Sequence, residues 1–193
     1  MGWRASASTA ELAGIKTSDI SLILHTHGHV DHAGSTAALK QILGIPAAVH
    51  LGDETLMRTG RMNPLRPLRL EAHLIKPVVD KPFPPVAPDL FVDESTDLGE
   101  LGLQGRILHT PGHTAGSISV LFPDGRAIVG DVMMGGYMGG NLFGSRPNYH
   151  YFADDLETVR QSIKQLLDLR VSEFYVGHGG PLAADSVHRA FRQ

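Results

Sequence analysis

Residues 25–32 read HTHGHVDH, which places four histidines and one aspartate within eight residues. The whole chain has only 11 histidines, so this stretch is strongly enriched in imidazole. Imidazoles packed together repel one another once any of them is protonated, and a bound cation would offset that repulsion. The stretch therefore predicts a metal site, to which the rest of the chain should add further ligands.

Composition limits the ligands and the partners. The chain has no cysteine, so a metal here has to bind His, Asp or Glu rather than thiolates. Its 193 residues are enough for one domain, which we expect to span residues 1–193. A formal net charge of −3, with no stripe of Lys or Arg, argues against nucleic acid as a partner. No apolar run is long enough to cross a membrane and no signal peptide is evident, so we expect a cytoplasmic enzyme with a small-molecule substrate.

Short apolar runs predict the strands of an α/β or α+β fold. The expected strands are residues 20–24, 47–50, 105–109, 117–122, 127–130 and 173–177. The expected helices are residues 154–169, residues 184–191 and one that ends at Gly44. Asp154 or Asp155 is expected to be the N-cap of the first of these.

Two long segments show neither a helical nor a strand period. Residues 58–89 are dense in proline and arginine, so we expect no helix or strand there and interpret them as a surface insertion or a lid. Residues 132–153 are rich in Gly, Met and Tyr and are expected to be irregular. The candidate substrate contacts in this second segment are Tyr137, Arg146, Tyr149, His150 and Tyr151. An anionic group of the substrate could meet Arg61, Arg66 or Arg69.

Four strand-like runs each end in a short, glycine-containing loop that carries a metal-capable residue. In chain order these loops carry His27, His29, Asp31 and His32, then His113, then Asp131, then His178. Strands of one sheet usually present functional residues at a shared edge, so we expect these loops to converge. Neutral imidazole and carboxylate suit zinc, iron or manganese.

Spacing suggests two ions. His27 and His29 are two residues apart, so in an extended segment they face the same way and can bind one ion. Asp31 and His32 follow where the chain turns into a helix, and are better placed for a second ion. The other histidines are expected to be structural or solvated: His25, His50, His73, His109 and His188.

These motifs resemble the metallo-β-lactamase superfamily. The matching elements are THGHVDH (26–32), TPGHTAGS (110–117), VGD (129–131) and VGHGGP (176–181), within a resemblance that covers residues 12–190. The resemblance implies an αββα sandwich with a two-metal site at one edge. It implies one metal bound by His27, His29 and His113, a second bound by Asp31, His32 and His178, and Asp131 bridging them.

The start of the chain departs from the family pattern. Family members normally have several strands before this histidine motif, whereas only 24 residues precede His25. We therefore expect an N-terminally shortened sandwich. A homodimer is also expected, because the sheet edges left exposed would need covering.

Aspartate at position 131 makes the chain similar to glyoxalase II, the lactonases and the general metallo-hydrolases rather than to the β-lactam-hydrolysing members. The resemblance implies a binuclear hydrolase of a small-molecule thioester, ester or lactone, with zinc as the first candidate metal and iron or manganese next. β-Lactam hydrolysis would be at most a side activity. The expected nucleophile is a hydroxide bridging the two metals, oriented by Asp31 as the catalytic residue. Two alternatives stay open, a phosphodiesterase or nuclease of the same superfamily and an inactive, truncated metal-binding relic.

Overall fold

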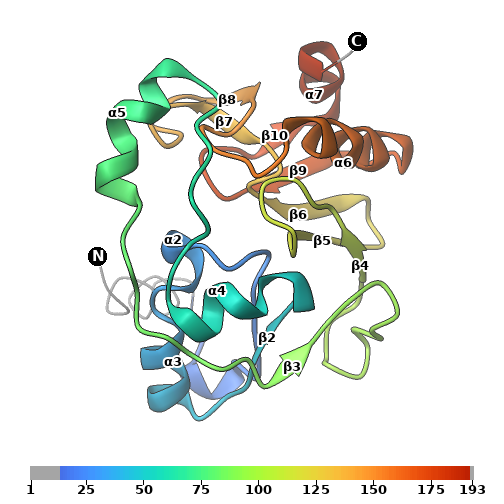
Figure 1. Ribbon diagram of the computed structural model, residues 1–193. Helices are drawn as coiled ribbons and strands as arrows, with labels where there is room; N and C mark the ends of the chain where they lie inside the picture. The colour runs from blue at the N-terminus through green and yellow to red at the C-terminus, as the bar shows by residue number, and fades with distance from the viewer. Residues whose placement is uncertain (1–13, 192–193) are drawn as a thin grey trace.

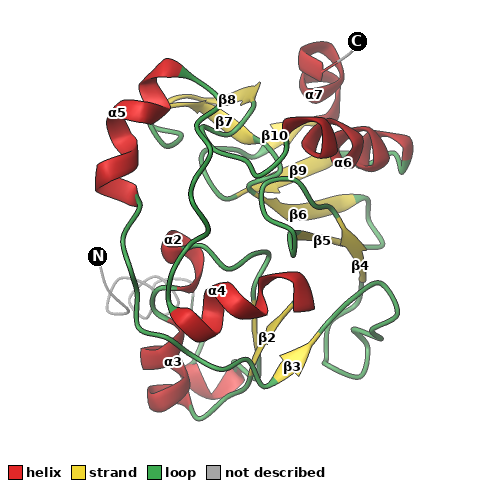
Figure 2. Cartoon of the chain, viewed as in Figure 1, coloured by secondary structure: helices red, strands yellow, loops and turns green. Residues whose placement is uncertain are grey.

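The computed structural model describes residues 14–191, which form a mixed α/β fold with three sheets (Figures 1 and 2). The strands are β1 (Ile23–Leu24), β2 (Ala47–Val49), β3 (Leu90–Phe91), β4 (Arg106–His109), β5 (Ile118–Leu121), β6 (Arg126–Gly130), β7 (Met134–Tyr137), β8 (Leu142–Asn148), β9 (Glu173–Val176) and β10 (Leu182–Ala183). The helices are α2 (Val30–Ala33), α3 (Thr36–Leu43), α4 (Glu54–Thr59), α5 (Leu70–Val79), α6 (Leu156–Asp168) and α7 (Ala184–Phe191), with 3₁₀ helices η1 (Thr17–Asp19) and η2 (Leu51–Asp53). In this described part of the chain, no helix combines the length and apolarity needed to cross a membrane.

The largest sheet has the strand order β10-β9-β6-β5-β4. Strand β5 runs antiparallel to both β4 and β6, and β6 runs parallel to β9. Strands β4, β6 and β9 therefore point the same way, and their carboxyl ends meet at one edge. Helices α6 and α7 cover the outer face of this sheet (Figure 1), where Ile163 and Leu166 of α6 pack with Phe174 of β9.

A second, smaller sheet has the order β1-β2-β3, with all strands parallel. It packs against the large sheet through an apolar cluster that includes Ala48 on β2 and Ile107 and Ile118 on β4 and β5. A backbone hydrogen bond of 2.8 Å from Ile118 N to Thr26 O joins the two sheets at one edge. Helices α3 and α4 lie on the far side of the small sheet (Figure 2), so the layers follow the αββα order that the motifs imply.

Most predicted elements occur, several with shorter bounds. The run 20–24 is a strand only over Ile23–Leu24. The predicted helix 154–169 is α6, and Asp155 is its N-cap, since its carboxylate accepts a 2.6 Å hydrogen bond from Thr158 N. Gly44 ends α3 in the left-handed conformation, with φ of 67°.

The prediction that residues 58–89 contain no helix is wrong, because α4 extends to Thr59 and α5 spans Leu70–Val79. The prolines mislead because of where they lie rather than how many there are. Pro67 and Pro77 leave nine proline-free residues between them, enough to start a helix. Pro77 lies in the last turn of α5, where a missing N–H costs few of the helix's hydrogen bonds.

The prediction that residues 132–153 are irregular is also wrong, because β7 and β8 form an antiparallel hairpin there. Glycine has low strand propensity, so its abundance hides the strands in the sequence. In the structure the glycines allow close backbone approach, since a Cβ at Gly135 would collide with the carbonyl oxygen of Gly144.

Candidate metal centre

The metal-capable loops converge at the edge where the two sheets meet. The loop after β1 carries His27 and His29, and α2 carries Asp31 and His32. His113 lies between β4 and β5, Asp131 directly follows β6, and His178 follows β9. We expected the edge of one sheet. The structure instead uses two sheets, because β1 pairs with β2 rather than with the strands that lead to His113, Asp131 and His178.

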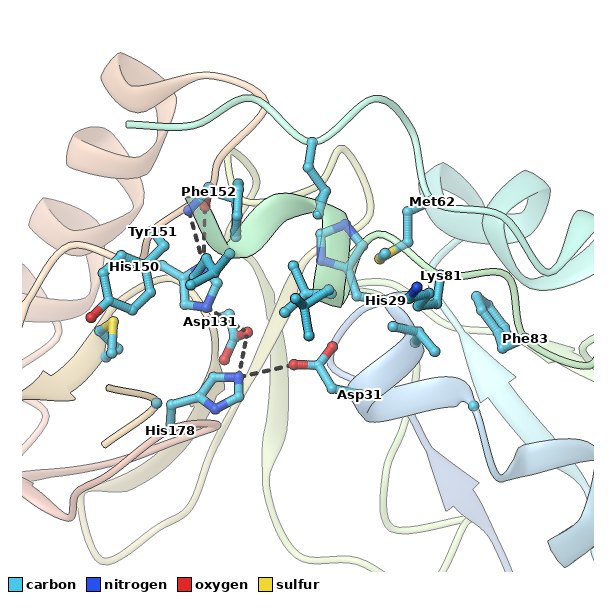
Figure 3. Close-up of a pocket in the computed structure, with 18 of the residues that line it drawn as sticks. His29, Asp31, Met62, Lys81, Phe83, Asp131, His150, Tyr151, Phe152 and His178 are labelled. Carbon is cyan, nitrogen blue, oxygen red and sulfur yellow. Dashed lines mark hydrogen bonds and ion pairs between the residues drawn. The ribbon is translucent and has the colours of Figure 1, made fainter. Parts of the chain in front are cut away.

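Asp131 lies at the centre of the cluster, between His150 and His178 in Figure 3. The Nε2 atoms of five histidines surround its Oδ2: His32, His150 and His178 at 3.4 Å, His113 at 3.6 Å and His27 at 3.8 Å. The carboxylate is 1% exposed, so water does not screen it from these rings. A single buried carboxylate facing several imidazoles is a suitable centre for bound cations.

Within residues 14–191 the ligand atoms form three overlapping groups, each with its members within 4.8 Å of one another. Two of them are His27, His29 and His113, and Asp31, His32, Asp131 and His178; the third is His113, Asp131 and His150. The structure thus brings together the same two sets that the resemblance implies, with Asp131 in reach of both. Their role as metal ligands remains a prediction.

Two buried polar atoms in this cluster support that prediction. Neither His27 Nε2 nor Asp131 Oδ1 finds a hydrogen-bond partner within residues 14–191. Buried polar groups are almost always paired, and an unpaired one is costly. A divalent cation would satisfy both atoms, so the donor set fits a metal.

Burial keeps the innermost histidines ready to bind a metal. Desolvation holds the pKa values of His27 and His113 well below the usual histidine range. Both rings are therefore neutral near pH 7, which is the form that binds metal. The backbone carbonyl of Phe152 accepts a 3.0 Å hydrogen bond from His113 Nδ1, which leaves Nε2 directed at the cluster.

The outer side of the cluster holds charge in the absence of a cation. Hydrogen bonds with Asp131 and Asp31 raise the pKa of His178 to about 10. Burial raises the pKa of Asp31, but its hydrogen bond with His178 and the charges of His32 and His178 together outweigh that effect, and the net result is a pKa of about 2. The His178–Asp31 contact is 3.0 Å and is drawn in Figure 3. A proton here balances the two carboxylates, and a divalent cation would replace it.

Asp53, which was not among the predicted site residues, ties two of the ligand loops together. Its buried carboxylate accepts 2.8 Å hydrogen bonds from Gly28 N, Thr114 Oγ1 and Gly116 N. Gly28 lies between His27 and His29, while Thr114 directly follows His113. The sequence holds a signal for Asp53, because it too follows a strand-like run through a glycine. It binds backbone and hydroxyl donors rather than the cluster.

The predicted substrate contacts are divided by the structure. His150 joins the cluster of histidines around Asp131, with its Nε2 at 3.4 Å from Asp131 Oδ2. Tyr151 lines a groove into which His29, Asp31, Asp131 and His178 also open. Tyr137, Arg146 and Tyr149 do not line that groove, because Arg146 is exposed on β8 and the Tyr149 ring packs on Phe191 at 4.8 Å.

The arginines proposed to meet an anionic substrate also lie outside the groove. Arg66 donates a 3.1 Å hydrogen bond to Asp154 O, and Arg69 donates to Asn148 Oδ1. Both guanidinium groups therefore brace the protein's own loops rather than face the metal cluster.

The histidines beside the motifs have structural roles. His25 is buried and lies 2.9 Å from Thr36 Oγ1, and burial lowers its pKa to about 4. The ring of His109 donates to Ala115 O at 2.9 Å and stacks on His50 with centroids 4.3 Å apart. Neither belongs to the cluster around Asp131.

The sequence as a whole identifies the family. The profile of the metallo-β-lactamase superfamily matches residues 2–178. The chain belongs to the metallo-β-lactamase superfamily. Its relatives include the probable metallo-hydrolase YflN of Bacillus subtilis, 28% identical over 84% of this chain and 66% of that protein. A hydroxyacylglutathione hydrolase of Anaeromyxobacter dehalogenans is 34% identical over 65% of this chain and 37% of that protein.

Solved structures of this superfamily share the fold. TTHA1623 in a di-iron-bound form matches 96% of this chain and 82% of that chain, with a TM-score of 0.68 at 23% identity. The B3 metallo-β-lactamase BLEG-1 also has a TM-score of 0.68, over 98% of this chain and 84% of that chain, at 19% identity. The chain spans less than two thirds of the length of the two curated relatives named above.

Proposed function

We propose that the protein is a binuclear, metal-dependent hydrolase of a small-molecule thioester, ester or lactone. Membership of a superfamily of metallo-hydrolases supports the reaction class. The observation that carries the two-metal proposal is the pair of ligand groups on either side of Asp131, with unpartnered His27 Nε2 and Asp131 Oδ1 between them. Zinc is the first candidate metal, and the di-iron form of TTHA1623 keeps iron as the second.

The residues divide the work between the two ions. His27, His29 and His113 would hold one, while Asp31, His32 and His178 would hold the other, and Asp131 would touch both. Bound divalent metals polarise a carbonyl oxygen and lower the pKa of water from 15.7 to about 7. Burial keeps His27, His113 and Asp131 away from bulk water. The lower local dielectric constant would strengthen their electrostatic attraction to a bound cation.

We assign to Asp31 the transfer of a proton from the attacking water to the leaving group. Its carboxylate is ionised and is 46% exposed, so one oxygen faces the groove while Oδ2 pairs with His178. An ionised carboxylate in this position can orient the attacking water, accept its proton and then pass that proton to the leaving group. The aspartate at position 131 and the hydroxyacylglutathione hydrolase relative support a thioester as the first substrate to test.

The test is a substrate panel on protein reconstituted with zinc. We expect hydrolysis of an aliphatic thioester or lactone to exceed that of a β-lactam and of bis(p-nitrophenyl) phosphate. His113→Ala should remove that hydrolysis, which excludes a contaminating enzyme. Fastest turnover of the phosphodiester would support the nuclease alternative instead. No turnover of any compound by the metal-loaded protein would support the inactive relic.

A further inference from the structure

The metal cluster forms the floor of a groove with a volume of about 1160 Å³. His29, Asp31, Asp131, His150 and His178 face into it from below. This volume exceeds the 300–1,000 Å³ that is usual for pockets that hold drug-sized ligands. The groove therefore has room for a substrate that extends well beyond the bond to be cleaved.

The walls of the groove are apolar on both sides. Helix α5 contributes Leu74 and Ile75, and the segment after it contributes Phe83. The β7–β8 turn contributes Met138 and the segment after β8 contributes Tyr151, which lies in the same apolar cluster as Ile75. Figure 3 shows Phe83 and Tyr151 on opposite sides of the histidines and aspartates.

Several apolar side chains of the walls are exposed to solvent, which is unfavourable for hydrophobic groups of their size. Leu74 is 77% exposed, Val78 is 71% exposed and Met138 is 71% exposed. An apolar surface of this kind that is continuous with a catalytic floor marks a ligand-binding groove. A bound aliphatic group would remove these side chains from water.

Charge argues for an uncharged occupant. Outside the metal cluster, the charged residues that line the groove are Glu71 and Lys81, which have opposite signs. Among residues 14–191 no arginine lines it, although a bidentate arginine is the usual partner for a substrate carboxylate. A peptide-like thioester with several carboxylates, such as a glutathione conjugate, would find little to pair with here.

The α5 wall is held over the cluster by Ala72 and Ile75, which pack in one apolar cluster with Tyr151, and by hydrogen bonds before and after the helix. At one end Leu68 N donates to Tyr151 O at 2.9 Å, one residue from His150. At the other end Phe83 N donates to Gly60 O at 2.9 Å and Val86 N donates to Met57 O at 2.9 Å. The first of these bonds joins the wall to the segment that carries His150, so the wall and that part of the floor are built together.

We propose that this groove binds the aliphatic part of the substrate, so that the protein prefers thioesters or lactones with a medium-length or long, uncharged acyl group. The choice of bond rests on the proposed hydrolase function, whereas the apolar subsite rests on the walls alone. The competing occupant is a second copy of the chain, which could bind the exposed stripe of Leu70, Leu74 and Val78 on α5. Leu70 separates the two, because it is 81% exposed on the same helix but does not line the groove.

The test uses the full, zinc-loaded protein and acetyl, hexanoyl and decanoyl thioesters of N-acetylcysteamine. We expect kcat/KM to rise about threefold for each methylene that the groove covers. Leu74→Gln on α5 and Met138→Gln on the β7–β8 turn should lower kcat/KM for the decanoyl thioester about tenfold and leave the acetyl value nearly unchanged. The matched control Leu70→Gln should leave the whole series unchanged.

A second readout does not depend on turnover. Decanoate binding by isothermal titration calorimetry should show a negative heat-capacity change and should weaken in Leu74→Gln but not in Leu70→Gln. If no thioester is hydrolysed while decanoate binds in this way, the hydrolase proposal fails and the apolar subsite stands. Equal rates across the series in an active enzyme that does not bind decanoate would overturn the subsite. Loss of a dimer in both Leu70→Gln and Leu74→Gln, with unchanged selectivity, would assign the stripe to a second copy and overturn it too.

Discussion

The floor and the α5 wall of the groove are adjacent, but they are built in different ways. Most floor residues lie on short loops directly after strands, and hydrogen bonds such as those of Asp53 fix these loops. The wall is a helix that packs with Tyr151 through Ala72 and Ile75, while other apolar side chains such as Leu74 remain exposed. From this difference we expect the floor to determine the chemistry and the wall to determine which substrate binds. Substitutions on the two sides should therefore have separable effects.

The largest effect is expected from Asp131→Ala, which removes the carboxylate shared by both ligand groups. We expect hydrolysis to fall by about 10³-fold or more and the metal content to fall with it. Decanoate binding should keep its negative heat-capacity change, because the apolar wall is intact even when the carboxylate of decanoate loses its contact with the metal. Steady-state kinetics, elemental analysis and calorimetry measure these three quantities. A parallel loss of decanoate binding would show that floor and wall form one inseparable unit.

Asp53→Ala should have the next largest effect, on stability. It leaves two backbone N–H groups and one hydroxyl without their acceptor in a buried site. We expect the free energy of unfolding to fall by about 3–5 kcal/mol, as measured by urea denaturation. Asp53→Asn keeps one acceptor oxygen and should lose less. A change within about 0.5 kcal/mol for Asp53→Ala would contradict the role given to this residue.

The acid sensitivity of the metal-free protein should depend on His25, a buried histidine whose ring contacts Thr36. Burial lowers its folded-state pKa to about 4, whereas the unfolded value is near 6.5. Between these values the unfolded chain binds the extra proton, so stability falls as the pH falls. The shift corresponds to about 3 kcal/mol lost between pH 6.5 and pH 4. Unfolding measured across this range should show a shallower pH slope in His25→Gln; identical slopes would refute the assignment.

His150→Ala should have the smallest of these effects. Its Nε2 faces Asp131, and with His113 and Asp131 it forms a third candidate ligand group, outside the two that the resemblance implies. We expect about tenfold weaker zinc binding in competition with a chelator dye. Tyr149→Phe is the matched control on the neighbouring residue, whose ring packs on Phe191 away from the cluster. Equal weakening in both variants would mean that the segment, rather than the His150 ring, matters.

The sequence was informative about the floor because strand ends leave little freedom. A short loop after a buried strand puts its side chain near the sheet edge, so His113, Asp131 and His178 could be placed from local pattern alone. Asp53 escaped because it acts through backbone donors of loops distant in sequence. The sequence places His150 among the substrate contacts, because it does not predict β7 and β8, the hairpin that positions this residue.

The wall could not be predicted because its structure depends on contacts between distant segments. The helical period of α5 is masked by Pro67 before the helix and Pro77 within it. The position of α5 depends on the hydrogen bond from Leu68 N to Tyr151 O. Arg66 and Arg69 look like ligands for an anion in the sequence, yet their partners are Asp154 and Asn148. Side chains of this kind can be assigned only once the tertiary structure is known.

The most direct test of the two-metal centre is the metal content per chain after reconstitution with zinc and removal of unbound ions. His113→Ala and His178→Ala, one in each ligand group, are the informative variants. We predict about two zinc ions per chain in the unmodified protein and about one in each variant. One ion or none in the unmodified protein, or two in both variants, would contradict the proposed binuclear site.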